Sequence, residues 1–152
     1  MGEKRKVTMD VVARVKRLRS TARPPFRATS GSVGYDIYAA EEGHIQPQQW
    51  HVVGTGISIT PPKGTYVRIA PTSRNAANGL WINAGVVDPD YTGELKVCVH
   101  NLNPCVYRYQ AGTKIAQIIF EFAMCPVIAE VDALSVTARG EGGFGSTEST
   151  PI

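Results

Sequence analysis

Short apolar runs with a period of two residues constrain this chain more than any other feature of its sequence. In GELKVCVH (93–100) and GISIT (56–60), apolar and polar residues alternate. Successive side chains of a β-strand point to opposite faces, so this alternation predicts strands with one buried face. The residues predicted to face the core are Ile57, Ile59, Leu95, Val97 and Val99. Two more β-rich runs are TYVRIAP (65–71) and KIAQIIFEF (114–122), of which the second is apolar enough to be buried on both faces.

Turn-forming residues separate these runs at short intervals, as in TPPKG (60–64), DPDYTG (88–93) and NLNP (101–104). Many short strands joined by turns predict an all-β sandwich or barrel. The one helical candidate begins at Ser73, which is expected to cap a turn or two before Gly79 ends it. At 152 residues the chain is long enough for one domain with its own core.

Composition excludes several classes of protein. No apolar run approaches the roughly twenty residues of a membrane span, and MGEKRKVTMDVV (1–12) lacks the apolar stretch of a secretory signal. Cys98, Cys105 and Cys125 cannot all pair and show no metal-binding spacing. We therefore expect free thiols that act as small core residues, in a reducing compartment such as the cytoplasm or the nucleus. The three histidines share no spacing with acids or cysteines that indicates zinc or a nucleophilic triad.

Nine Lys or Arg residues lie between Lys4 and Arg27, against one acid, Asp10. Such a segment could bind nucleic acid or direct nuclear import. Its only aromatic residue is Phe26, so the side chains that stack on bases are missing. We interpret the segment as a solvated basic face, beginning with a loose arm at residues 1–10, and predict that the protein requires no nucleic acid as a partner.

The segment NAGVVDPDYTGELKV (83–97) carries the most informative chemistry, because two apolar runs flank a turn sequence. A hairpin here would expose backbone N–H and C=O groups that can read the edge of a flat heterocycle. Asp88 ends an apolar run and is the better acid for a shielded site, whereas Asp90 lies in the turn. Asp88 could equally serve only as a turn residue.

Three further segments offer polar groups. Asp36 could hold water around a divalent metal or be a paired charge. Ser73 and Arg74 offer a hydroxyl and a guanidinium to an anion. Gln117 lies in an apolar strand, where leaving it unpaired would cost about 1–3 kcal/mol, so it needs a partner. The C-terminal end of the chain, RGEGGFGSTESTPI (139–152), is either disordered or a glycine-rich segment that wraps around a ligand.

Five of these segments, in this order, resemble the five motifs of the trimeric dUTPases (deoxyuridine 5′-triphosphate nucleotidohydrolases). They are GYDIYAA (34–40), PTSRNA (71–76), AGVVDPDYTGE (84–94), KIAQIIFE (114–121) and RGEGGFGST (139–147). The resemblance implies a single-domain β-jelly roll that forms a homotrimer, with C-terminal tails exchanged between subunits. It divides the chain into the arm at 1–10, a core at 11–138 and a flexible lid at 139–152 that closes a neighbour's site.

The resemblance also implies an activity, the hydrolysis of dUTP to dUMP and pyrophosphate, which limits uracil in DNA and supplies dUMP for dTMP synthesis. Asp88 would be the general base that activates water for attack at the α-phosphorus. Mg²⁺ would be held mainly by the triphosphate, with Asp36 touching its water shell. The substrate-binding residues would be Ser73, Arg74, Asn83, Gly85, Val87, Tyr91, Lys96, Gln117, Arg139, Phe144, Gly145, Ser146 and Thr147.

In this scheme Ser73 and Gln117 contact phosphate oxygens, and the backbone of the 83–96 hairpin reads uracil. Tyr91 packs against the deoxyribose and leaves no room for a 2′-hydroxyl. Phe144 stacks on uracil, while Arg139 reaches the terminal phosphate.

The second motif departs from the family pattern PRSGLA, because Thr72 replaces the arginine and Arg74 follows the serine. In an extended segment residues two apart face the same side, so we predict that Arg74 reaches the same phosphates. Lys114 also stands where arginine is usual in the fourth motif. The altered motif leaves an alternative, a non-catalytic or weakly active binding or regulatory trimer. A related dCTP-deaminating enzyme agrees less well with Tyr91 and Phe144.

Overall fold

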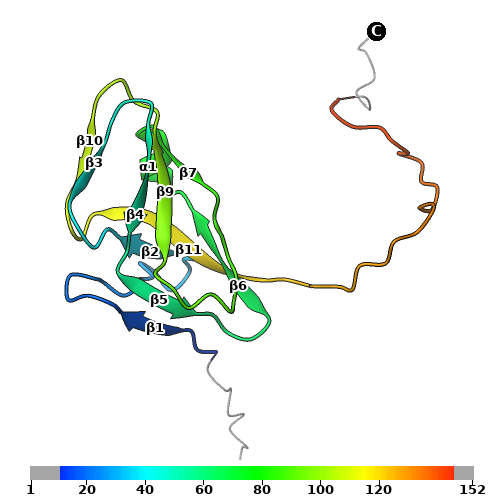
Figure 1. The fold of residues 1–152 in the computed structure, drawn as a ribbon, viewed down its shortest axis with the longest axis horizontal. Helices are drawn as coiled ribbons and strands as arrows, with labels where there is room; N and C mark the ends of the chain where they lie inside the picture. Colours follow the sequence, from blue (N-terminus) through cyan, green and yellow to red (C-terminus); the bar gives the residue numbers. More distant parts are fainter. Residues whose placement is uncertain (1–10, 146–152) are drawn as a thin grey trace, which may run out of the picture.

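The structure is a computed structural model that describes residues 11–145. Within them it has eleven strands and one short helix (Figure 1). The strands are β1 (Arg14–Arg17), β2 (Tyr35–Tyr38), β3 (Gly43–Ile45), β4 (Trp50–Gly54), β5 (Ile57–Thr60), β6 (Thr65–Ala70), β7 (Leu80–Asn83), β8 (Val86–Val87), β9 (Lys96–Asn101), β10 (Tyr107–Tyr109) and β11 (Lys114–Phe122); the helix is α1 (Ser73–Ala77).

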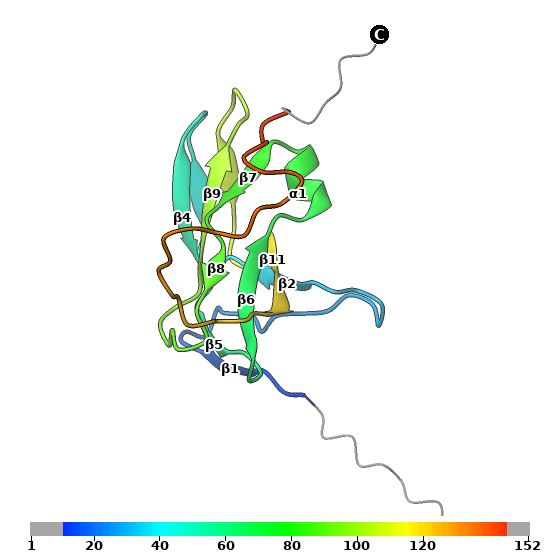
Figure 2. The ribbon, with the colours of Figure 1, turned by 90° about the vertical axis from the view of Figure 1, so that its right-hand side faces the viewer.

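Two antiparallel sheets form the body of the protein. One has the strand order β2-β11-β6-β8 and the other β4-β9-β7, while β1 pairs with β5 and β3 with β10. Figure 2 shows β4 and β9 on one side of the body and β6, β11 and β2 on the other. The predicted all-β fold is confirmed, and the arrangement is a β-jelly roll.

The core between the sheets is one cluster of apolar side chains from both of them. Leu95, Val97 and Val99 are at most 2% exposed, and Ile57 and Ile59 at most 4%, as the alternation predicted. Burying one such side chain stabilises the fold by about 1.5–3 kcal/mol. In β11 both faces are buried only near its start, where the register shifts between Lys114 and Ala116.

Helix α1 ends as expected, but it begins differently. Gly79 follows it with a φ of +73°, a left-handed conformation that suits glycine. The cap is Thr72 rather than Ser73, because Thr72 keeps an extended backbone while its hydroxyl oxygen accepts a hydrogen bond from the Asn75 N–H at 3.2 Å. Ser73 is therefore the first helical residue.

The cysteines are free, as predicted, but they are not core residues. Cys98 is half-buried because it lies on the outer face of β9, opposite to the side that carries Val97 and Val99. Cys105 and Cys125 are exposed in irregular segments. Within residues 11–145, no helix has the length and apolar character to cross a membrane.

After β11 the chain leaves the body (Figure 1). Residues 123–141 are all exposed, although many are apolar, and Val127 and Val136 are at least 95% exposed. This segment buries almost none of its apolar surface on its own chain. The arm predicted at 1–10 lies outside the described residues, and the predicted division at residue 138 stays a prediction.

Candidate active site

Most predicted site residues fall into two pockets or onto the C-terminal segment, whereas Asn83 and Gly85 line neither pocket. The helix pocket, about 560 Å³, lies among α1, β2 and β11 and includes Asp36, Ser73, Arg74 and Gln117. The loop pocket, about 240 Å³, lies along the connection from β8 to β9 and includes Val87, Asp88, Tyr91 and Lys96. No predicted site residue lines both pockets.

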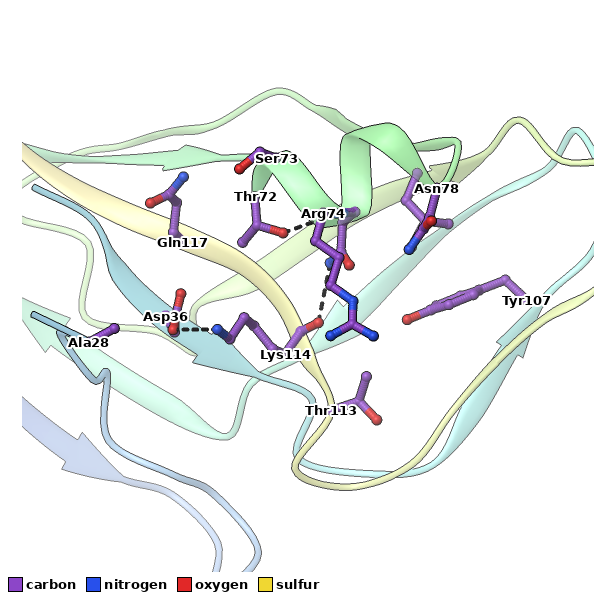
Figure 3. A pocket seen from close by; sticks show the side chains of 12 residues that line it. Ala28, Asp36, Thr72, Ser73, Arg74, Asn78, Tyr107, Thr113, Lys114 and Gln117 are labelled. Carbon is purple, nitrogen blue, oxygen red and sulfur yellow. Dashed lines mark hydrogen bonds and ion pairs between the residues drawn. The ribbon is translucent and has the colours of Figure 1, made fainter. Parts of the chain in front are cut away.

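Hydrogen bonds and an ion pair fix one side of the helix pocket. The Lys114 ammonium lies 2.6 Å from a carboxylate oxygen of Asp36, whose side chain is only 15% exposed (Figure 3). Asp36 is thus a paired charge, one of its two possible roles. Gln117 donates to the Pro71 carbonyl at 2.9 Å, so the predicted partner exists. Gly34 makes room for Gln117, because a Cβ there would lie 1.8 Å from the Gln117 carbonyl oxygen.

Arg74 lines this pocket, but not for the reason that its spacing suggested. The segment is helical from Ser73, and residues two apart on a helix do not face the same side. The extended-segment argument is therefore wrong. Figure 3 shows the Arg74 side chain extending from α1 into the pocket, on the side nearer Tyr107 than Asp36. Arg74 is exposed and forms no ion pair within residues 11–145.

Several residues of the helix pocket were not predicted. The buried Asn75 amide donates to the carbonyls of Lys114 and Ile115 at 3.2 and 3.0 Å, which ties α1 to β11. Tyr107 and Thr113 also line the pocket, and burial raises the pKa of the Tyr107 phenol. No local sequence pattern marks these residues, because packing between distant segments brings them to the pocket.

The ends of the predicted hairpin pair, because β7 and β9 are antiparallel with Asn83 opposite Cys98, but the two runs next to the turn do not pair with each other. β8 pairs with β6, whereas β9 pairs with β4 and β7, so the two runs flanking the turn belong to different sheets. Gly85 lets the chain cross between the sheets, because its φ of +137° favours glycine. Its carbonyl accepts a hydrogen bond from the Ile69 N–H at 2.7 Å. A side chain would not fit here, since a Cβ on Gly85 would lie 2.7 Å from the Ile69 carbonyl oxygen. Ala84, with φ +57°, is also left-handed.

Several polar residues of this loop, including Asp88 and Lys96, are exposed to solvent. Asp88 is exposed, and its carbonyl accepts from the Tyr91 N–H at 3.1 Å, which closes the turn. Tyr91 is 48% exposed. The Lys96 ammonium lies 4.0 Å from the Glu94 carboxylate. Asn83 contacts Cys98, with 3.9 Å between its amide nitrogen and the sulfur. In the single chain Asp88 is therefore not shielded.

The C-terminal candidates lie apart from the body (Figure 1). Arg139 donates from its Nε to the Gly142 carbonyl at 2.9 Å, which forms a local turn. Phe144 is fully exposed, and both Phe144 and Gly145 have positive φ angles, of 52° and 89°. Ser146 and Thr147 lie outside the described residues.

The charges of the helix pocket suit an anion. Two cationic side chains, Arg74 and Lys114, line it with one carboxylate, Asp36. Within residues 11–145, no group of three His, Cys, Asp or Glu side chains could hold a metal ion.

Comparisons with known proteins agree on one family. The dUTPase family profile matches residues 21–148. The deoxyuridine 5′-triphosphate nucleotidohydrolase of Paramecium bursaria Chlorella virus 1 is 46% identical over 134 residues, which cover 88% of this chain and 95% of that protein. The enzyme of the same name from Saccharomyces cerevisiae is 42% identical over 142 residues, covering 92% and 97%. A solved structure of a dUTPase mutant from Staphylococcus bacteriophage 80alpha with dUpNHpp is 27% identical, covers 90% of this chain and 98% of that chain, and has a TM-score of 0.85.

Proposed function

This chain belongs to the dUTPase family, and we propose that it hydrolyses dUTP to dUMP and pyrophosphate with Asp88 as the general base. As a dUTP diphosphatase it needs a site for the triphosphate and an acid that activates water. The observation that carries this assignment is that one chain holds both parts, the cationic helix pocket and the Asp88 loop. None of the comparisons favours the alternative of a non-catalytic trimer.

The proposed reaction begins at Asp88. Its carboxylate accepts a proton from a bound water, and the water oxygen forms a bond to the α-phosphorus of dUTP. The bond from that phosphorus to the bridging oxygen breaks, and pyrophosphate leaves. The exposure of Asp88 leaves its carboxylate free to contact water.

The helix pocket supplies fixed donors for the charge that develops on the phosphate oxygens. Ser73 offers a hydroxyl at the start of α1, and Arg74 a guanidinium that has no ion-pair partner within residues 11–145. Gln117 is held by Pro71 through one of its amide hydrogens, so the other is available to a phosphate oxygen.

The donor set agrees with Mg²⁺ held mainly by the substrate. Asp36 is the one carboxylate that lines the helix pocket, and Mg²⁺ in proteins commonly uses one or two carboxylates, several waters and substrate phosphates. Asp36 would contact the metal through a water. When bound, Mg²⁺ would neutralise charge on the triphosphate.

The nucleoside would be read by the loop pocket and the C-terminal segment. The backbone around Asn83, Gly85 and Val87, with Lys96 beside it, would contact uracil. Tyr91 would pack against the deoxyribose, where its half-exposed ring is accessible. Phe144 would stack on uracil, Gly145 would allow a close approach, and Arg139, Ser146 and Thr147 would contact the phosphates.

We further propose that a homotrimer brings these parts together. The two pockets share no lining residue, and the C-terminal segment exposes apolar side chains that its own body does not cover. In a trimer, the helix pocket of one subunit would face the loop pocket of a second, and the C-terminal segment would close the site.

The test is pyrophosphate release from dUTP in the presence of Mg²⁺. We expect turnover by the natural chain and almost none by Asp88→Asn, whereas tight dUTP binding without turnover in the natural chain would identify a binding protein. Coexpression of Asp88→Asn with Ser73→Ala then tests the shared site. If each site draws residues from two subunits, mixed trimers regain activity above either parent; if each chain holds a whole site, they do not.

A further inference from the structure

We infer that Arg19 is a positioning residue for sugar selection, because it holds the loop that carries Tyr91 in place through Glu94. The inference rests on the proposed contact of Tyr91 with the deoxyribose. It adds a residue outside the five motifs and outside the matched family segment, which begins at residue 21.

Arg19 and Glu94 form a two-point contact across 75 residues of sequence. One terminal nitrogen of Arg19 lies 2.9 Å from each carboxylate oxygen of Glu94. The Gly56 N–H donates to the same carboxylate at 2.9 Å, and the Glu94 side chain is only 15% exposed. Gly54 leaves room for it, because a Cβ there would lie 2.7 Å from a Glu94 oxygen. Arg19 therefore fixes a largely buried charge.

Glu94 in turn fixes the tyrosine. The Tyr91 hydroxyl donates to the Glu94 carbonyl at 3.1 Å. The ring lies over Gly93, where a Cβ would be 2.5 Å from the Tyr91 hydroxyl oxygen. Since Tyr91 is 48% exposed, its position depends on this backbone more than on packed side chains. A shift of Glu94 would move the ring that is proposed to exclude the 2′-hydroxyl.

Arg19 itself is held by the body of the protein. It follows β1, which pairs with β5, and the neighbouring Leu18 N–H donates to the Gly56 carbonyl at 2.7 Å. Arg19 also pairs with Glu41, whose side chain is 70% exposed. The exposed Glu41 pair is expected to matter little, since solvent screens it. We therefore expect Arg19 to affect the selection of deoxyribose over ribose through its contact with Glu94.

The experiment compares the kcat/KM values for dUTP and UTP in the same preparation. The fraction of folded enzyme cancels in their ratio, so a merely structural role would leave the ratio unchanged. We expect Arg19→Ala to reduce the preference for dUTP by about tenfold, because small misplacements of a positioning group have large kinetic effects. Glu94→Gln should act in the same direction. Glu41→Gln is the matched control and should keep the wild-type ratio.

Arg19→Lys provides a second measurement if the alanine variant does not fold. Lysine keeps the charge but lacks the planar guanidinium, so it should give a smaller fall in the ratio. An unchanged ratio in both Arg19→Lys and Glu94→Gln would overturn the inference. A wild-type chain that does not hydrolyse dUTP would instead contradict the proposed function, and a wild-type chain without preference for dUTP over UTP would contradict the proposed role of Tyr91.

Discussion

The helix pocket and the loop pocket differ in how their polar side chains are held. In the helix pocket, Asp36 is paired with Lys114 and Gln117 is bonded to a backbone carbonyl. In the loop pocket, Asp88 is exposed, and Tyr91 is 48% exposed with its hydroxyl donating to the Glu94 carbonyl. The first pocket is thus organised within one chain, whereas the second leaves its reactive group in water.

This difference has a physical meaning for catalysis. A phosphate site gains from donors that are fixed before the substrate arrives. A general base needs access to water and then protection from bulk solvent during the reaction. The loop pocket provides the access alone, so we expect the protection to come from another part of the proposed trimer. The exposed apolar side chains of residues 123–145, such as Val127 and Val136, offer uncovered surface that could provide this protection.

The largest effect should follow a change in the loop pocket. Replacing Asp88 by Asn removes the proton acceptor with little change in shape, and a general base contributes roughly 10²–10⁴-fold to the rate. We expect kcat for dUTP to fall by that factor while KM changes little, because the helix pocket stays intact. Steady-state kinetics with dUTP measure both constants.

Asp90→Asn is the matched control, since Asp90 is an exposed acid two residues further along the same turn. It should keep most of the wild-type kcat. Equal losses in the two variants would mean that the loop needs its negative charge in general, and the distinction between Asp88 and Asp90 would be lost.

The next effect should come from the C-terminal segment. Phe144→Ala removes an aromatic ring that is fully exposed in the single chain. Stacking of an aromatic side chain on a base contributes about 1–3 kcal/mol, so we expect kcat/KM for dUTP to fall by roughly ten- to a hundredfold. Val136→Ala, at another fully exposed apolar position of this segment, should change it far less. Normal kinetics in Phe144→Ala would show that the loop pocket is covered by something else.

A smaller effect should follow from the helix pocket. Arg74→Ala removes a guanidinium that has no ion-pair partner within residues 11–145, and one charge-assisted hydrogen bond contributes about 1.5–3 kcal/mol. Because Arg74 is exposed, we expect the lower end, a rise of about tenfold in KM for dUTP with a smaller change in kcat. Arg108→Ala, an exposed arginine of β10 that does not line the pocket, serves as control. Unchanged rate and affinity in Arg74→Ala would exclude a role for this arginine.

The sequence predicted best where the physics is local. The alternation of apolar and polar residues correctly places Leu95, Val97 and Val99 in the core, because successive side chains of a strand point to opposite faces. Gln117 needed a partner and has one, since an unpaired amide in an apolar strand is costly. The helix cap was predicted less well. Threonine and serine are both common at the N-cap, and only the extended backbone of Thr72 shows that it, rather than Ser73, is the capping residue.

Contacts between distant segments were beyond the sequence. The pairing of β8 with β6 rests on two valines, too short a run to show which sheet it joins. The Arg19–Glu94 pair joins residues 75 positions apart, and nothing local marks either as a partner of the other. Cys98 was predicted as a core residue from its type alone, although its place in the alternation puts it on the outer face.

The smallest effect is expected from a change in the four-stranded sheet, outside both pockets. It should alter the stability of the protein but not its kinetics. Tyr66 donates to Glu121 at 2.5 Å and Arg68 donates to it at 2.7 Å. These hydrogen bonds, that of Tyr66 first, hold the pKa of Glu121 below its usual 4.5. The folded state then binds fewer protons than the unfolded state near that pH, so the stabilisation is present above pH 4.5 and is lost as the pH falls through the lower, folded-state pKa.

Glu121→Gln should therefore be less stable than the wild type at neutral pH, and the gap should narrow as the pH falls below 4.5. Urea midpoints at a fixed protein concentration, measured at neutral pH and at about pH 3.5, test this change. Glu130→Gln, in the exposed segment after β11, should show no such narrowing. Both variants should keep the wild-type kcat/KM at neutral pH, because neither side chain lines a pocket. A large loss of activity in Glu121→Gln would mean that the four-stranded sheet and the active site are coupled, and that Glu121 affects the kinetics without lining either pocket.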